Sequence, residues 1–138
     1  MSFVLDTNVV SEPRKRSRAD AGVMRWLSSV EDEELYVSVL TIGEIRQGIE
    51  GIRGRDPVQA GHLESWLAGL RRDYAERILP VDLETAGEWG RMNPPDPVSA
   101  VDGLMAATAK VRNMTFVTRN TADVERTGVR LLNPFEAP

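Results

Sequence analysis

The sequence has no cysteine, only one histidine and no apolar run long enough to cross a bilayer. The lack of cysteine excludes disulfides and thiolate metal sites, and it is typical of cytoplasmic proteins. The single histidine, His62, excludes zinc sites that use several histidine ligands. A membrane-spanning helix needs about 20 consecutive apolar residues, and the first residues show no signal-peptide pattern. We therefore expect a cytoplasmic protein with no membrane partner.

Basic residues are also few for a protein that binds nucleic acid. The chain has 138 residues, with 17 basic and 21 acidic side chains and a net charge of −4. Proteins with a broad nucleic-acid-binding face are usually basic. If the four acids singled out below form a metal pocket, the remaining acids balance the 17 bases, as expected for a local pocket on a neutral body. The length predicts a single domain over residues 1–138.

Strand-like and helix-like segments alternate along the chain. Apolar runs predict strands at residues 3–5, 35–39, 78–81, 114–117 and 129–132. Apolar residues three and four apart predict helices that include residues 23–30, 42–52, 62–72, 86–92 and 100–112. Pro94, Pro95 and Pro97 are expected to end the fourth helix. This alternation predicts a three-layer α/β/α fold with a mostly parallel central sheet of about five strands.

Four carboxylates stand where predicted strands end or helices begin. They are Asp6 after residues 3–5, Glu44 after residues 35–40, Asp102 after the proline-rich turn and Asp123 after residues 114–118. In right-handed βαβ units, such positions converge on one edge of the sheet. Carboxylates gathered there repel one another unless they hold a cation. Because all the ligands are oxygens, the pattern favours Mg²⁺ or Mn²⁺.

Each acid also has a purely structural interpretation as part of a helix cap. Thr41-x-x-Glu44 has the spacing of a capping box, and Ser99-x-x-Asp102 has a related form. Asp6 and Asp123 would each lie in a short helical turn, near its positive end. Unrelated caps would be scattered around the molecule, whereas these four acids are expected at one edge. We therefore interpret the set as a metal site.

Four motifs that contain these acids resemble, in order, the motifs of PIN-domain ribonucleases. They are Leu5-Asp6-Thr7-Asn8, Ser38-Val39-Leu40-Thr41-Ile42-Gly43-Glu44-Ile45, Val101-Asp102-Gly103-Leu104-Met105-Ala106-Ala107-Thr108-Ala109 and Val117-Thr118-Arg119-Asn120-Thr121-Ala122-Asp123. The resemblance runs from about residue 3 to residue 134, and more narrowly it is to VapC-type toxins of toxin–antitoxin pairs. Val124 departs from the pattern, because many relatives have an aromatic residue there. The departure concerns local packing and leaves the carboxylates in place.

This resemblance implies a PIN-like fold and an endoribonuclease that hydrolyses RNA phosphodiester bonds with Mg²⁺ or Mn²⁺. The catalytic and metal-binding residues, carried over by position, are Asp6, Glu44, Asp102 and Asp123. Asp6 and Asp102 are expected nearest the metal, while the other two acids complete or position a second, weaker site. A metal-bound water serves as the nucleophile in such sites, so no histidine or lysine base is required.

Neighbouring polar residues are expected to support the acids. Thr7 and Asn8 are expected to orient Asp6, and Thr118 is expected to hydrogen-bond a carboxylate or a bound water. The basic segment Arg14-Lys15-Arg16-Ser17-Arg18 follows the first strand and is expected at the same edge as Asp6. It either grips RNA phosphates or is a solvated loop without a ligand, and the sequence leaves both open.

The aromatic residues and the histidine receive ordinary structural roles. Trp26, Trp66 and Trp89 are expected in the core or in an interface, since an aromatic residue on a helical stripe usually faces core. His62 is expected to be an ordinary helical residue.

The resemblance also implies protein partners. One is a second copy of the chain in a homodimer. The other is a cognate antitoxin, whose tail would lie in a groove between the early helices and block the acidic pocket, for example with an inserted arginine. DNA is expected to be contacted only indirectly, through the antitoxin complex.

Two other functions fit parts of the pattern. A catalytically silent PIN-fold module would only bind a partner and act in a repressor complex, but the intact acids argue against it. A phosphoryl-transfer enzyme with an aspartate nucleophile also has an Asp after its first strand. Such enzymes use Asp-x-Asp, whereas the second position here is Asn8, and Lys15 and Lys110 are poorly placed to contact a phosphate.

Overall fold

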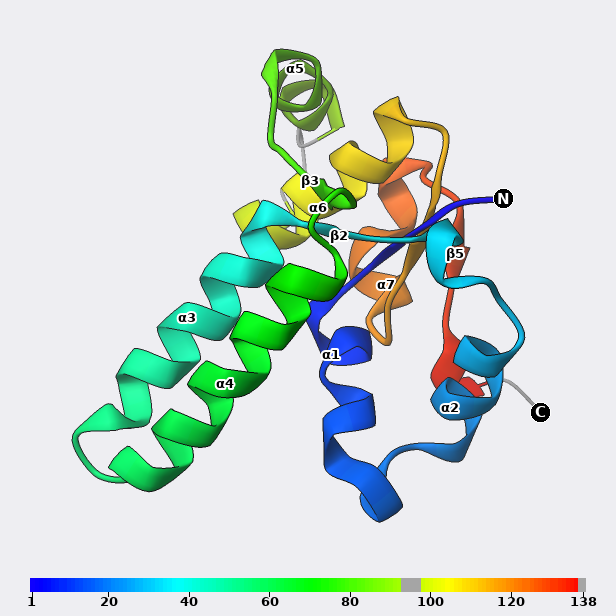
Figure 1. Ribbon diagram of the computed structural model, residues 1–138. Coiled ribbons are helices and arrows are strands. Elements are labelled where there is room, and N and C mark those ends of the chain that lie inside the picture. Colours follow the sequence, from blue (N-terminus) through cyan, green and yellow to red (C-terminus); the bar gives the residue numbers. More distant parts are fainter. Residues whose placement is uncertain (93–97, 137–138) are drawn as a thin grey trace.

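The computed structural model describes residues 1–92 and 98–136 and is built around one parallel sheet (Figure 1). The strands are β1 (Phe3–Leu5), β2 (Leu35–Ser38), β3 (Ile78–Leu79), β4 (Thr115–Val117) and β5 (Leu131–Leu132). Their order is β3-β2-β1-β4-β5, and every neighbouring pair is parallel. The predicted α/β fold with a five-stranded sheet is confirmed. Because the strands are parallel, their carboxyl ends meet at one edge, with β1 in the middle.

Side chains of the central strands alternate between two cores. Phe3 and Leu5 of β1 are buried in one core, and Val4 is buried in the other. The register places Leu5 beside Val37 of β2 and Val117 of β4, and both of these residues join the core that contains Leu5. Since both faces of the sheet carry apolar side chains, helices have to cover both.

The first core is covered by α2 (Ala21–Ser28), α3 (Val39–Arg53) and α4 (Pro57–Asp73). Each of these helices begins at a side chain that accepts a hydrogen bond from an amide of the first turn, namely Asp20, Ser38 and Asp56. α3 and α4 lie side by side as a helical hairpin (Figure 1). This hairpin projects one face of α4 toward the segment that follows β1.

The second core is covered by α5 (Leu83–Met92), α6 (Ala100–Val111) and α7 (Thr121–Val124). α6 is buried on most of its surface, because it lies between the sheet and α5. Gly103 of α6 allows this close approach, since a Cβ there would lie 3.0 Å from two ring atoms of Trp89 in α5. Val124, the position that departs from the PIN pattern, is fully buried in this core.

Short segments complete the chain. They are α1 (Thr7–Val10) and the 3₁₀ segments η1 (Glu12–Arg18), η2 (Asp32–Glu34), η3 (Glu125–Thr127) and η4 (Pro134–Glu136). Among the helices of residues 1–92 and 98–136, none is both long and apolar enough to span a bilayer.

The predicted element boundaries differ from the structure by a few residues. All five strands form, but four of them are shorter than predicted, and α3 begins at Val39 where the sequence predicts a helix from residue 42. The earlier start follows from Ser38, whose side chain accepts a hydrogen bond from the Leu40 amide. The predicted helix end at Pro94, Pro95 and Pro97 falls on residues 93–97, outside the described residues.

Candidate active site

Asp6 lies at the carboxyl end of β1, where it is the N-cap of α1. Its Oδ1 accepts a hydrogen bond of 2.7 Å from the Thr7 amide. Its Oδ2 accepts bonds from Thr118 Oγ1 at 2.7 Å and from Asn8 Nδ2 at 3.4 Å. Only 6% of Asp6 is exposed, so these contacts fix its carboxylate in one orientation. A carboxylate has about four acceptor positions, so one stays available for a ligand.

The surroundings of Asp6 raise the pKa of its carboxyl above the ordinary value. Burial is the largest cause, and the negative charges of Asp102 and Glu44 add to it. The hydrogen bonds from Thr118 and Thr7 act in the opposite direction. The influence of Asp102 and Glu44 shows that acids from α6 and α3 gather near the end of β1. A cation bound among them would relieve the repulsion.

Glu44 reaches this region from the second turn of α3. Its Oε1 accepts a hydrogen bond of 2.6 Å from Thr7 Oγ1, which also lies 3.1 Å from Thr41 Oγ1. The capping box predicted for Thr41 and Glu44 is wrong, because α3 begins at Val39 and is capped by Ser38. The carboxylate of Glu44 is therefore turned away from its own helix terminus and toward the residue that follows Asp6.

Asp102 and Asp123 line a common hollow of about 400 Å³ beside α6 and α7. Asp102 lies in the first turn of α6, and its Oδ2 accepts a hydrogen bond of 2.9 Å from Ser99 Oγ. The cap suggested by the Ser99-x-x-Asp102 spacing does not form, because the Ser99 side chain accepts no hydrogen bond from an amide of the first turn and its hydroxyl donates to Asp102 instead. The charges of Glu44 and Asp102 raise the pKa of Asp6, and Asp123 shares the hollow with Asp102. We call these four carboxylates the acid group.

The acid group offers only carboxylate oxygens, which suits a hard divalent cation. Among residues 1–92 and 98–136, no three acidic or histidine side chains enclose a single ion position. Mg²⁺ keeps several waters and usually takes one or two carboxylates, so it does not need a closed cage of protein ligands. The donor set therefore fits a partly hydrated magnesium ion.

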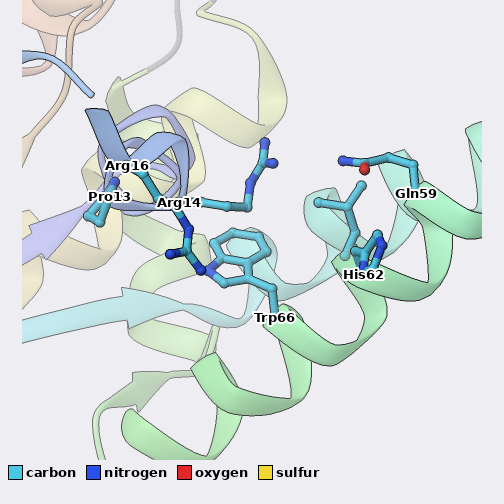
Figure 2. A pocket seen from close by; sticks show the side chains of 7 residues that line it. Pro13, Arg14, Arg16, Gln59, His62 and Trp66 are labelled. Carbon is cyan, nitrogen blue, oxygen red and sulfur yellow. The ribbon is translucent and has the colours of Figure 1, made fainter. Parts of the chain in front are cut away.

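A second hollow, with a basic lining, lies between η1 and α4. This η1–α4 cleft has a volume of about 630 Å³ and is lined by Pro13, Arg14, Arg16, Gln59, His62, Leu63 and Trp66. Figure 2 shows the two arginine side chains on η1 facing the side chains of α4. Lys15 instead pairs with Glu12 at 3.0 Å, and exposed Arg18 is not part of the lining. The structure thus brings only part of the predicted basic segment into one cleft.

Sequence reasoning missed that Trp66 and His62 belong to this cleft. Trp66 does pack partly against the core, as predicted, but it also lines the cleft beside Arg14. The available signal was the spacing of Gln59, His62 and Trp66, which are three and four residues apart and share one face of α4. That spacing does not reveal which segment the face meets, because η1 lies more than forty residues earlier in the chain.

Comparison with known proteins gives consistent matches over nearly the whole chain. The family model of the PIN domain matches residues 3–129. The toxin FitB of Neisseria gonorrhoeae is 33% identical and covers 96% of this chain and 98% of its own length. The VapC ribonuclease Y4jK of Sinorhizobium fredii is 31% identical over 97% of this chain and 98% of the relative. A solved structure of FitAB bound to the IR36 DNA fragment contains a chain that is 31% identical, with a TM-score of 0.88 over 99% of this chain and 97% of that chain.

Proposed function

Because the chain belongs to the PIN-domain family, we propose that it is a metal-dependent endoribonuclease and the toxin of a toxin–antitoxin pair. The observation that carries the proposal is buried Asp6, whose pKa is raised by burial and by the charges of Asp102 and Glu44. A buried carboxylate crowded by two others is unfavourable unless a cation binds it, and such cations activate water in phosphodiester hydrolysis. The relatives named as a toxin and as a VapC ribonuclease support the same function.

We expect the acid group to divide into two pairs by role. Asp6 and Asp102 would hold the metal, which we expect to be Mg²⁺ or Mn²⁺. Glu44 and Asp123 would complete or position a second, weaker site. When bound, the metal lowers the pKa of a coordinated water and offsets the charge of the scissile phosphate.

The remaining residues of the site act by positioning the carboxylates. Thr118 and Asn8 donate to Oδ2 of Asp6, and the Thr7 amide donates to Oδ1. Thr7 also donates through its hydroxyl to Glu44, so one residue couples the two acids. Outer hydrogen bonds of this kind typically change metal affinity or activity by about 10–100-fold when they are removed.

Basic side chains near the start of the chain would bring RNA to the acid group. Arg14 and Arg16 face the η1–α4 cleft, and Lys15 and Arg18 add positive charge to the same segment. RNA affinity from such contacts should fall with rising salt, because each phosphate contact releases counterions.

We extend the proposal to the partners of the enzyme. A cognate antitoxin would inhibit it, the toxin would form a homodimer, and DNA would be contacted only through the antitoxin complex. The FitAB complex on a DNA fragment, which contains a chain similar to this one, supports a protein partner and a DNA contact made by the complex. Residues 1–138 would form a single nuclease domain, located in the cytoplasm.

The test is RNA cleavage by purified, partner-free protein with Mg²⁺, with Mn²⁺ and in excess chelator. We expect cleavage only with metal, and we expect Asp6→Asn and Asp102→Asn to lower the rate by about a thousandfold or more, because several kcal/mol of transition-state stabilisation are lost. RNA ends mapped by sequencing, for wild type and Asp6→Asn expressed in cells, would give the target and the cut sequence.

The matched control is Asp73→Asn, which removes the charge of an exposed carboxylate outside the acid group. It should cleave like the wild type. Full cleavage by Asp6→Asn, or by wild type in chelator, would contradict the proposal. A folded wild-type protein that cleaves no RNA with either metal would instead favour a silent partner-binding module.

A further inference from the structure

The η1–α4 cleft concentrates positive charge in a protein whose net charge is −4. The described residues that line it include two arginines and a histidine but no carboxylate. Within residues 1–92 and 98–136, neither Arg14 nor Arg16 forms an ion pair, whereas Arg46, Arg53, Arg91 and Arg112 each do. Two guanidinium groups that face a cleft without a carboxylate partner form a site for an anion.

The cleft also carries an aromatic surface. Trp66 and Leu63 of α4 are partly buried against the core and form its apolar wall. The guanidinium of Arg14 lies over the Trp66 ring, with Cζ 5.5 Å from the ring centroid. Nucleobases stack on aromatic rings and on arginine planes alike. Gln59 and His62, also on α4, add groups that can donate and accept hydrogen bonds at a base edge.

The cleft is preformed on the η1 side. Glu12 is buried, and its carboxylate accepts hydrogen bonds from the Asp20 amide and from Lys15. Arg16 has a φ of 55°, a left-handed backbone conformation that non-glycine residues rarely adopt. Such conformations persist where the surrounding structure enforces them, and they are common at binding sites. The anchored backbone of η1 therefore places Arg14 and Arg16 opposite α4.

We propose that the η1–α4 cleft binds one nucleotide of a single-stranded RNA, with the phosphate held by Arg14 and Arg16 and the base packed against Trp66. The inference rests on the proposed function and deepens it, by naming where the substrate strand is held beyond the acid group. The chain itself links the two places, since Asp6 caps α1 and η1 follows α1 after Ser11. A volume of about 630 Å³ is in the range of small-molecule sites and accommodates a nucleotide.

The lining favours RNA over a protein segment as the occupant. Single-stranded RNA supplies phosphates and an exposed base together, and it is recognised by aromatic stacking combined with arginine contacts. An acidic peptide would satisfy the arginines but would not need the combination of an aromatic wall with Gln59 and His62. A protein occupant is therefore an outcome that the test has to distinguish.

The experiment measures binding without cleavage. A fluorescein-labelled single-stranded oligouridylate is titrated with the full chain in excess chelator, and anisotropy is followed over a range of salt concentrations. The double variant Arg14→Ala/Arg16→Ala should weaken binding about tenfold or more and lower the salt slope by about one to two. Trp66→Leu keeps an apolar side chain against the core and should weaken binding about fivefold or more, with little change in salt slope.

The matched control is Arg71→Ala/Arg72→Ala, which removes the same charge from exposed positions of α4 outside the cleft. Retained wild-type affinity in this control, with circular dichroism unchanged in every variant, supports the cleft. Equal losses in both double variants would show a general charge effect and overturn the inference. RNA affinity unchanged in the Arg14/Arg16 variant, together with lost binding to the cognate partner protein, would make the cleft a protein surface and overturn it as well.

The same preparations are assayed for metal-dependent cleavage, so the two ideas can fail separately. Wild-type protein that cleaves RNA, with variants that bind the oligouridylate normally, would refute only the nucleotide site. Wild-type protein that neither cleaves nor binds RNA would refute the proposed function and the nucleotide site together.

Discussion

The acid group and the η1–α4 cleft differ in how firmly their charged side chains are held. Asp6 is buried and accepts hydrogen bonds from Thr7, Asn8 and Thr118. Arg14 and Arg16 are exposed, and among the described residues no carboxylate pairs with either of them. Bond cleavage requires fixed geometry, whereas gripping a flexible strand tolerates side-chain movement. Folding therefore fixes the Asp6 carboxylate and leaves the guanidinium groups of Arg14 and Arg16 free to adapt.

Removing the hydroxyl of Thr118 tests the fixed side of this comparison and should have the largest effect among changes that leave the acid group intact. In Thr118→Val the carboxylate of Asp6 loses its 2.7 Å hydrogen bond, and the Asn120 amide loses its acceptor. We expect RNA cleavage to fall about 10–100-fold. Oligouridylate binding in chelator should not change, because the cleft is untouched.

Thr115→Val is the matched control for Thr118→Val, since Thr115 is also buried, at the start of the strand that Thr118 follows. Among the described residues, its hydroxyl hydrogen-bonds only to the sulfur of Met1. It should cleave RNA like the wild type. Equal losses of activity in the two variants would show that any change in β4 disturbs the enzyme, and the special role of the Thr118 hydroxyl would be abandoned.

Gly103→Ala tests whether close helix packing places Asp102. The added Cβ would meet the Trp89 ring at 3.0 Å, so the Trp89 side chain, α5 or the first turn of α6 has to move by a few tenths of an ångström. We expect unfolding free energy to fall by about 1–3 kcal/mol, as in other overpacked cores. Cleavage should fall more than RNA binding, because Asp102 lies beside Gly103 in the first turn of α6.

Gly90→Ala is the control for this change, because a Cβ on Gly90 of α5 has no atom within 4 Å. It should leave stability unchanged or raise it by about 0.5–1 kcal/mol, since alanine favours helix more than glycine does. Urea titration monitored by circular dichroism measures both variants. A Gly103→Ala protein as stable as Gly90→Ala would show that the helices adapt at no cost.

The sequence predicts the acid side of the molecule better than the basic side. Asp6 follows a buried strand, and the parallel sheet makes β1 and β4 neighbours, so the contact between Asp6 and Thr118 follows from strand order. Local patterns of this kind translate directly into position, because the carboxyl ends of parallel strands share one edge. The partner of Glu44 was not predictable in this way. Ser38 and Thr41 are both residue types that cap helices, and in the structure Ser38 is the N-cap of α3.

The cleft could not be predicted, because its two walls are far apart in the sequence. An amphipathic stripe on α4 predicts a buried face, and Trp66 satisfies that rule while also facing Arg14. The arginines give no periodic signal, since η1 is irregular and contains the left-handed residue Arg16. The sequence also cannot show which arginines are already paired. Arg46 and Arg53 form ion pairs with acids of the α3–α4 hairpin.

Glu12→Gln tests whether η1 needs its anchor. In the wild type, burial raises the pKa of Glu12, but hydrogen bonds from Lys15 and the Asp20 amide outweigh this effect and hold the pKa below its ordinary value of 4.5. The ionised form of Glu12 is therefore favoured in the folded state. Its contribution to the unfolding free energy is present above about pH 4.5 and is lost as the pH falls further. The variant should lose about 1 kcal/mol at neutral pH and should bind oligouridylate slightly less well.

Glu33→Gln is the control for Glu12→Gln, because Glu33 is an exposed acid elsewhere on the surface. Urea titrations of both variants at neutral pH and near pH 3 separate the effects. The difference between wild type and Glu12→Gln should shrink at the lower pH, whereas Glu33→Gln should match the wild type at neutral pH. A difference that stays constant with pH would show that the charge of Glu12 does not anchor η1.

Glu64→Ala should have the smallest effect on stability. Unlike the other changes, it should strengthen oligouridylate binding. Glu64 lies on α4 and pairs with Arg46 at 2.7 Å and with Arg53 at 2.6 Å, and these bonds lower its pKa to about 2. Because the network is exposed, its loss should barely change the melting temperature, and the change should vanish at high salt. Removing a negative charge two residues from His62 should slightly strengthen oligouridylate binding at low salt. A melting temperature lowered as far as in Gly103→Ala would instead show that these ion pairs hold the hairpin, and with it the α4 wall of the cleft, in place.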